Sequence, residues 1–113
     1  MINTKTLEPK LIDFGSAVKL KSPNQKFVAF AGTLVYAPPE WEAGLCYQPG
    51  PSTVWTLGIV LYVMIYGYTP EQKNFQHDRF YASKDLINLM DQMLESNPTK
   101  RVALCEISKQ LRR

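Results

Sequence analysis

The longest apolar run in the sequence, VWTLGIVLYVMIY at residues 54–66, is the feature that most restricts the fold. It is shorter than the roughly 20 residues that a helix needs to cross a bilayer. Because apolar side chains occur on every side of it, the run is typical of a helix that is buried all round. We therefore predict a core helix over 54–66, with Ser52 as its N-cap at the end of the breaker stretch 48–52.

Two shorter helices are predicted to follow. The first begins at Ser83, a favourable N-cap, and ends before the Asn-Pro pair at 97–98. Its apolar residues recur at helical spacing on one face. They are Leu86, Leu89, Met90, Met93 and Leu94. The apolar stripe of the last short helix consists of Leu104, Ile107 and Leu111.

The N-terminal third has a different pattern. Residues 1–3 and 10–13 have the character of two short strands around a turn at 4–9, which predicts a small β-hairpin. Pro9 must lie at the edge of its strand because it has no N–H to donate. Residues 15–33 show no sustained period, so we expect an irregular loop, and loops of this length are usually functional or disordered. A short helical turn is expected at 41–45.

Composition narrows the class of protein. A chain of 113 residues with 45% apolar residues is one domain or part of one, and it has enough apolar residues to build a core. The net charge of +3 is mild. The two basic clusters, Lys19 with Lys21 and Arg112 with Arg113, are explained by a solvated surface, so we expect no nucleic-acid binding. Neither a membrane span nor a secretory leader is expected.

The cysteines and the histidine do not form a metal site in the sequence. Cys46 and Cys105 have no metal or redox spacing, which favours two reduced thiols in a cytoplasmic protein, with the nucleus as a second location. His77 has no partner at ligand spacing, and we interpret it as a surface histidine.

Four motifs carry the functional information through their order. They are DFG at 13–15, GTLVYAPPEW at 32–41, VWTLGIVLY at 54–62 and NPTKR at 97–101. DFG alone is common by chance. Together, the four resemble the C-terminal lobe of a protein kinase, in which DFG and an A-P-E-type motif bracket the activation segment.

The resemblance narrows to the Pim family of serine/threonine kinases. The strings KLIDFGS and VYAPPEW are similar to that family's wording, including Pro38 where most kinases have Ala. Val54 agrees as well, because the Pim family resembles this chain in having Val at a position where most kinases have Asp. The resemblance covers almost the whole chain but less than half of a kinase catalytic domain.

The resemblance implies an α+β fold that is mainly α. Residues 1–113 would form a partial kinase C-lobe, with the hairpin and DFG at 1–15 and the activation segment at 13–40. The helical part at 41–113 would contain the apolar buried helix and the two C-terminal helices. Counting back from Asp13 places the family's metal-ligating Asn before Met1, so we expect the chain to begin just after the catalytic loop.

The resemblance also assigns roles near the DFG, with ATP and Mg²⁺ as the implied cofactors. Asp13 would ligate the Mg²⁺ that bridges the nucleotide phosphates, and Gly15 would give the backbone the freedom to aim it. Phe14 would pack inward and hold the turn. Ile12 would line the back of the adenine pocket, and Met1 would lie at its floor.

Further along, Thr33 would face the substrate and touch the catalytic Asp, and Pro39 and Glu40 would anchor the end of the activation segment. Glu40 would pair with Arg101, because the planar guanidinium suits a buried carboxylate. Two alternatives stay open on the residues alone. Asp13 could be an ordinary turn residue, and Glu40 and Arg101 could be unrelated surface charges.

Several parts of a phosphoryl-transfer site are absent from these residues. There is no Gly-rich loop, no strand Lys with its helix Glu, and no catalytic-loop base, so we assign no catalytic residue and expect the chain alone to be inactive. Ala29 and Ala31 stand where the family has acidic residues before its Gly-Thr. Tyr68 stands where the family has an acidic residue that helps to bind basic substrates.

Two functional hypotheses remain. In the first, the chain is part of a Pim-like kinase whose partners are protein substrates. In the second, it is a non-catalytic protein that binds a partner, including an intact kinase, through the apolar helix at 54–66. One face of that helix should be exposed, because the helices that surround it in a kinase precede the DFG.

Overall fold

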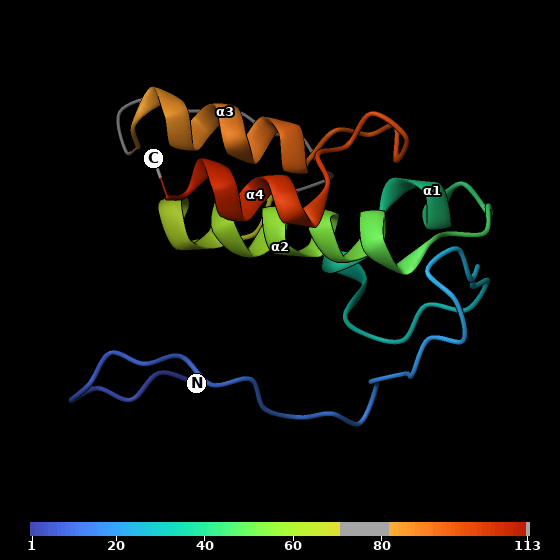
Figure 1. Ribbon diagram of the computed structural model, residues 1–113, viewed down its shortest axis with the longest axis horizontal. Coiled ribbons are helices and arrows are strands. Elements are labelled where there is room, and N and C mark those ends of the chain that lie inside the picture. Colours follow the sequence, from blue (N-terminus) through green and yellow to red (C-terminus); the bar gives the residue numbers. More distant parts are fainter. Residues whose placement is uncertain (71–81, 113) are drawn as a thin grey trace.

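A computed structural model of the protein describes residues 1–70 and 82–112. The elements in chain order are η1 (Leu34–Tyr36), α1 (Pro39–Glu42), α2 (Pro49–Tyr66), α3 (Lys84–Met93) and α4 (Leu104–Gln110). Figure 1 shows α2, α3 and α4 stacked as one helical body, with α1 at one end and the N-terminal segment running below it. The predicted core helix and the two C-terminal helices are confirmed.

The central helix α2 begins earlier than predicted. Its N-cap is Gln48 and Pro49 is its first residue, whereas Ser52 lies inside the helix and donates its N–H to the Gln48 carbonyl at 3.1 Å. The N-cap predicted at Ser52 is therefore wrong. Proline suits the first helical position because its φ is already helical and its missing N–H would have no partner there. The helix ends at Gly67, whose φ of 79° favours glycine and whose N–H donates to the Val63 carbonyl at 2.8 Å.

One side of α2 forms the core. Trp55, Ile59 and Tyr62 pack with Met90 and Leu94 of the α3 region. A second cluster joins α2 to α3 and α4 and consists of Val54, Leu89, Met93 and Ile107. These contacts explain the one-faced pattern of α3, because only its inner stripe meets α2.

The other side of α2 is exposed. Leu57 and Val60 are each 40% exposed and Met64 is 75% exposed, and the three residues recur on one stripe of the helix. The prediction of a helix buried all round is therefore wrong for the part of the chain that is described, whereas the expectation of one exposed face is confirmed. No described helix, α2 included, combines the length and the apolarity needed to span a bilayer.

The later helices begin and end as local chemistry requires. The Ser83 hydroxyl caps α3 by accepting the Leu86 N–H at 3.3 Å, as the sequence predicted. Residues 71–81, which include His77, lie outside the described residues. Cys46 and Cys105 are both free thiols in exposed positions.

The predicted N-terminal β-hairpin is wrong, because the described residues contain no strand. The chain does fold back on itself, with one isolated antiparallel bridge between Ile2 and Pro9. The Met1 amine donates to the Lys10 carbonyl at 2.9 Å, and the Lys10 N–H donates to the Met1 carbonyl at 2.8 Å. All residues of 1–24 are exposed, so no apolar surface supports a ladder, and two strands alone are only marginally stable in water.

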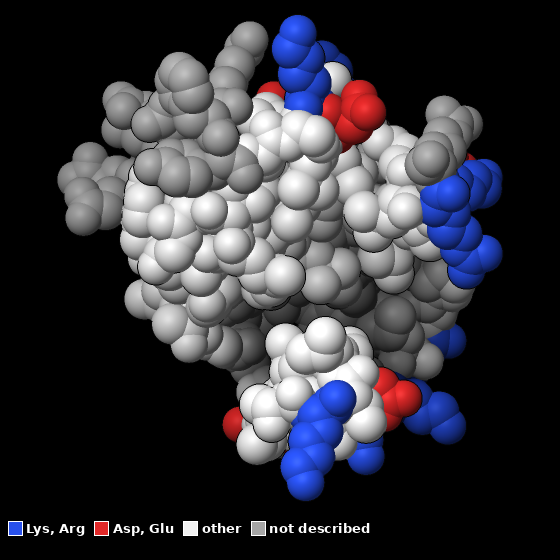
Figure 2. All heavy atoms as spheres, turned by 90° about the vertical axis from the view of Figure 1, so that its left-hand side faces the viewer, with Lys and Arg blue, Asp and Glu red and all other residues white. Residues whose placement is uncertain are grey.

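Charged residues are distributed differently in the N-terminal segment and in the helical body. Residues 1–30 contain five lysines and two acidic residues, whereas residues 31–113 contain eight basic and eight acidic residues. Figure 2 looks at the end of the molecule where the N-terminal segment forms a separate lower lobe with several lysines, under a helical body whose face is mostly uncharged. The net positive charge of the chain therefore belongs to its exposed N-terminal segment.

A tyrosine cluster lies at the C-terminal end of α2. The ring of Tyr62 is 4.5 Å from that of Tyr66 and 5.9 Å from that of Tyr68, between centroids. Burial, together with a hydrogen bond to Tyr68 and the two neighbouring hydroxyls, raises the pKa of Tyr62 to about 12. Burial has this effect because it disfavours the charged phenolate.

We predict that Gly58→Ala destabilises the chain by about 1–3 kcal/mol, because overpacking at this site outweighs the better helix propensity of Ala. A Cβ at Gly58 would lie 2.7 Å from Leu94 Cδ2 and 3.1 Å from Met93 Cβ. Gly50→Ala is the matched control in the same helix. Nothing lies within 4 Å of its Cβ position, so this change should stabilise by about 0.4–1 kcal/mol. Urea unfolding measures both, and equal effects would contradict the close packing.

We predict that the free energy of unfolding falls as pH rises from about 10 to about 12. The unfolded chain releases the Tyr62 proton near pH 10, whereas the folded chain holds it to about pH 12. The folded state binds more protons in this window, so this contribution is complete below pH 10 and is lost across it. Unfolding measured at several pH values should show a smaller fall for Tyr62→Phe than for the unchanged chain. An equal fall would contradict the raised pKa.

Candidate functional site

The DFG turn is held by an interaction within the motif itself. Asp13 has a φ of 61°, a conformation that Asp tolerates better than most residues. Its Oδ1 accepts the Gly15 N–H at 3.2 Å, and the Ala17 N–H donates to the Phe14 carbonyl at 3.0 Å. This short side-chain-to-backbone turn presents the Asp13 carboxylate on the surface.

The residues expected to surround a nucleotide are exposed. Met1 is 80%, Ile12 56% and Phe14 69% exposed, so the first two do not line an enclosed pocket. The inward packing expected for Phe14 is not found, because no described element covers this segment. The carboxylate of Asp13 is a hard oxygen ligand of the kind that Mg²⁺ prefers, and its exposure leaves it accessible. As one carboxylate, Asp13 could fill one position of a Mg²⁺ shell. No group of three or more potential ligands gathers among residues 1–70 and 82–112.

Thr33 lies at the start of η1. Its carbonyl accepts the Tyr36 N–H at 3.0 Å, whereas its side chain makes no capping bond and is exposed. The Thr56 hydroxyl of α2 donates to the Tyr36 carbonyl at 3.3 Å, so η1 is tied to the central helix. The Thr33 hydroxyl is therefore free of helix capping and lies on a short turn that is anchored behind it.

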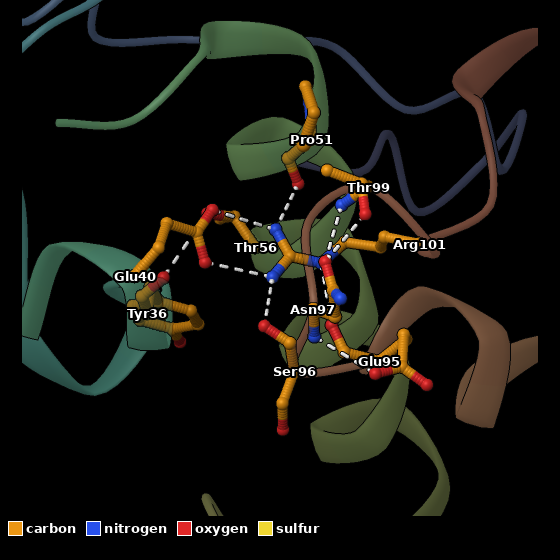
Figure 3. A network of polar contacts seen from close by, with 9 residues as sticks. All are labelled: Tyr36, Glu40, Pro51, Thr56, Glu95, Ser96, Asn97, Thr99 and Arg101. Atoms are coloured by element: carbon orange, nitrogen blue, oxygen red, sulfur yellow. Dashed lines mark hydrogen bonds and ion pairs between the residues drawn. The ribbon is translucent and has the colours of Figure 1, made fainter. Parts of the chain in front are cut away.

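Glu40 and Arg101 form a buried bidentate ion pair, shown in Figure 3. Arg101 Nη1 donates to Glu40 Oε1 at 3.0 Å, and Nη2 donates to Oε2 at 2.9 Å. Each residue is 6% exposed. The structure thus brings together the pair that the resemblance implied, across 61 positions of the chain.

The remaining donors of Arg101 are also used. They reach the carbonyls of Pro51 at 2.8 Å, Glu95 at 2.9 Å and Ser96 at 3.4 Å. The guanidinium also lies 5.1 Å from the ring centroid of Trp55. One side chain therefore joins α1, the first turn of α2 and the connection between α3 and α4. Burying this charge is tolerated because it is paired and its hydrogen bonds are satisfied.

A compact turn delivers Arg101 to this position. Asn97 Oδ1 accepts both the Thr99 N–H at 3.0 Å and the Thr99 hydroxyl at 2.7 Å, and Glu95 Oε1 accepts the Asn97 N–H at 2.9 Å. The sequence-based reasoning did not assign these contacts. The signal was present in Asn-Pro-Thr, because Asn side chains commonly close turns of this kind on the backbone two residues later.

The fold and this site define a class of protein. Residues 1–111 match the protein kinase domain, and the chain belongs to that family. The buried pair joins the end of the APPE-type motif to the NPTKR turn, two of the four motifs through which the sequence resembles kinases.

Relatives of this chain are serine/threonine protein kinases. The chain is 35% identical over 113 residues to the serine/threonine-protein kinase pim-2 of Danio rerio, covering 95% of this chain and 36% of the relative. It is 36% identical over 106 residues to the serine/threonine-protein kinase PSK2 of Saccharomyces cerevisiae, covering 87% and 9%. It is 33% identical over 117 residues to the calcium/calmodulin-dependent protein kinase type II alpha chain of Drosophila melanogaster, covering 88% and 22%.

These similarities show the family of the chain but not a particular kinase within it. The chain is homologous to serine/threonine protein kinases, and the identities to three differently named kinases lie within three percentage points of one another. They therefore support the kinase family without singling out one of its members. The chain spans little more than a third of the first of these relatives and less of the other two.

We predict that Glu40→Gln lowers the free energy of unfolding by about 3–5 kcal/mol, because it removes the negative charge that neutralises the buried Arg101 guanidinium. Glu106→Gln is the control. Its pair with Lys109 spans 2.6 Å, but the two side chains are 48% and 65% exposed, so the loss should be at most about 1 kcal/mol. Chemical denaturation compares the two variants. Similar losses would contradict a special role for the buried pair.

Proposed function

We propose that the chain is the C-lobe part of a Pim-like serine/threonine kinase that transfers the γ-phosphoryl group of ATP to Ser or Thr hydroxyls of proteins. The observation that carries this proposal is the buried pair of Glu40 and Arg101, which fixes the end of the activation segment on the helical body. Pro38 and Val54 support the narrower Pim-like assignment, because both match that family where most kinases differ. The cytoplasm and the nucleus are its proposed locations.

In this proposal Asp13 holds the Mg²⁺ that neutralises the nucleotide phosphates. The local hydrogen bond from the Gly15 N–H to Asp13 Oδ1, at 3.2 Å, orients the carboxylate before any metal binds. Thr33 stands on the loop that faces the substrate, and its exposed side chain is available for that contact. Met1 and Ile12 become parts of the adenine pocket only when other residues cover them.

The 113 residues by themselves should not catalyse transfer. They contain no Gly-rich loop, no phosphate-binding Lys on a strand and no catalytic base, so positioning and charge stabilisation would fall to one exposed carboxylate. Binding of Mg²⁺-ATP to these residues alone should be weak for the same reason, since a binding pocket normally buries most of its ligand.

A second candidate function rests on the exposed stripe of α2. Leu57, Val60 and Met64 present apolar surface that a non-catalytic protein could use to bind another protein, including an intact kinase. In the first proposal, the same stripe is covered by the rest of the kinase domain. The coding sequence upstream of Met1 separates the two proposals, because only the first requires an in-frame catalytic loop there.

We predict no transfer of γ-phosphate from Mg²⁺-ATP to a Ser/Thr peptide by the 113-residue chain. In the protein encoded together with its upstream sequence, Asp13→Asn should lower kcat by at least about a hundredfold, comparable to the loss of one transition-state donor. Glu8→Gln is the control, since Glu8 is an exposed carboxylate of the same segment.

Transfer by the short chain that Asp13→Ala abolishes would show that the chain is competent alone. An upstream sequence without a catalytic loop would reject the kinase proposal and support the binding protein.

A further inference from the structure

The turn after α2 carries the aromatic residue Tyr68. It follows Gly67, whose left-handed φ of 79° ends the helix and turns the chain back. Such an ending commonly brings the residue after the glycine against the last turns of its own helix. Tyr68 accordingly contacts Tyr62, with 5.9 Å between ring centroids and 81° between ring planes. Two positions later Pro70 is buried. The chain is thus fixed on both sides of Tyr68, and the side chain belongs to a preformed turn.

Tyr68 is part of the tyrosine cluster and still accessible. It is 57% exposed, whereas Tyr62 beside it is 2% exposed. A hydrogen bond joins the side chains of these two residues, and the ring centroid of Tyr66 lies 6.2 Å from that of Tyr68. Tyr66 itself is half-buried. The buried Tyr62 therefore supports a pair of partly accessible rings, Tyr66 and Tyr68, which we call the tyrosine subsite.

The core that supports the tyrosine subsite also supports the loop that contains Thr33. Tyr36 of η1 and Tyr66 both pack against the core cluster to which Tyr62 belongs. The Thr56 hydroxyl of α2 holds the Tyr36 carbonyl at 3.3 Å. The accessible rings at the end of α2 and the loop at the start of η1 are therefore attached to one packed body, which fixes their separation.

The tyrosine subsite offers no negative charge. No charged residue occurs from 43 to 70, a range that contains all of α2 and the turn after it. Figure 1 shows the C-terminal end of α2 on the side that Figure 2 views, where the helical body is mostly uncharged above the lysines of the N-terminal segment. A basic side chain bound here would lose water without gaining a carboxylate partner, which is costly. An aromatic side chain would instead gain ring contacts and buried apolar area.

We propose that Tyr66 and Tyr68 form a subsite that selects protein substrates with an aromatic side chain close to the accepting Ser or Thr. The chain would thereby differ from a kinase with an acidic residue at position 68, which selects a basic side chain. The role in substrate selection rests on the proposed kinase function, whereas the affinity of the two rings for an aromatic side chain does not.

A peptide series tests the subsite in the protein encoded together with its upstream sequence. Each position around a central Ser is set in turn to Phe, Arg or Ala, and kcat/KM is measured for every peptide. At one position Phe should be preferred to Ala by about fivefold, mainly through KM, which is the scale of an added aromatic contact. Arg should bring no gain over Ala at that position.

Variants of Tyr68 assign this preference to the subsite. Tyr68→Ala should remove the preference for Phe, and Tyr68→Asp should replace it with a preference for Arg. Tyr68→Phe keeps the ring and should keep the preference. Leu104→Ala is the control, since Leu104 is an apolar residue of α4 with a similar exposure of 51%. Each preference is a ratio within one variant, so partial unfolding of a variant does not change it.

Binding of the same peptides, labelled with a fluorophore, to the 113-residue chain separates the subsite from the reaction. The Phe peptide should bind more tightly than the Ala peptide, and Tyr68→Ala should remove the difference. The subsite proposal is overturned if Phe is preferred at no position, if Tyr68→Ala leaves the preference unchanged, or if the preference that depends on Tyr68 is for Arg. Binding that depends on Tyr68 without any transfer by the longer protein would reject the kinase proposal alone. Neither transfer nor a binding difference would reject both.

Discussion

The buried pair of Glu40 and Arg101 is the interaction on which the arrangement of the chain depends. It joins a four-residue helix, too short to be stable alone, to a turn at the other end of the sequence. The additional bonds from Arg101 to three carbonyls orient the start of α2 and the α3–α4 connection around the same group. The pair acts together with the bond from the Thr56 hydroxyl to the Tyr36 carbonyl, and Ala37 between them is fully buried.

Two kinds of stability therefore coexist in the chain. The helical body is held by α2 packing on α3 and α4, whereas the first 24 residues are exposed and held by local hydrogen bonds alone. The Asp13 turn lies in the second part and the Glu40 anchor in the first. Residues 27–29, which are hydrogen-bonded to Trp41 and Tyr47, lie at the boundary between the two parts.

Helices with a strong periodic pattern were predictable from the sequence, and α3 with its Ser83 cap is an example. The start of α2 was missed because Pro49 and Pro51 suggested a break, whereas proline also suits a first helical turn. The hairpin failed because two strands need a supporting surface that local sequence does not report. Glu40 and Arg101 were paired only through family resemblance. The contacts among the rings of Phe27, Phe30, Trp41 and Tyr47 were missed because the spacing of these residues shows no period.

The positions of the two tryptophans have an optical consequence. Trp55 lies in the core beneath the guanidinium of Arg101, and Trp41 is hydrogen-bonded to the activation segment. The tryptophan fluorescence of the chain is therefore a sum of two signals. One comes from Trp55 beside the buried ion pair, and the other comes from Trp41 beside the loop. Single-tryptophan variants would separate them, so loosening of the loop and melting of the body could be followed as distinct events in one molecule.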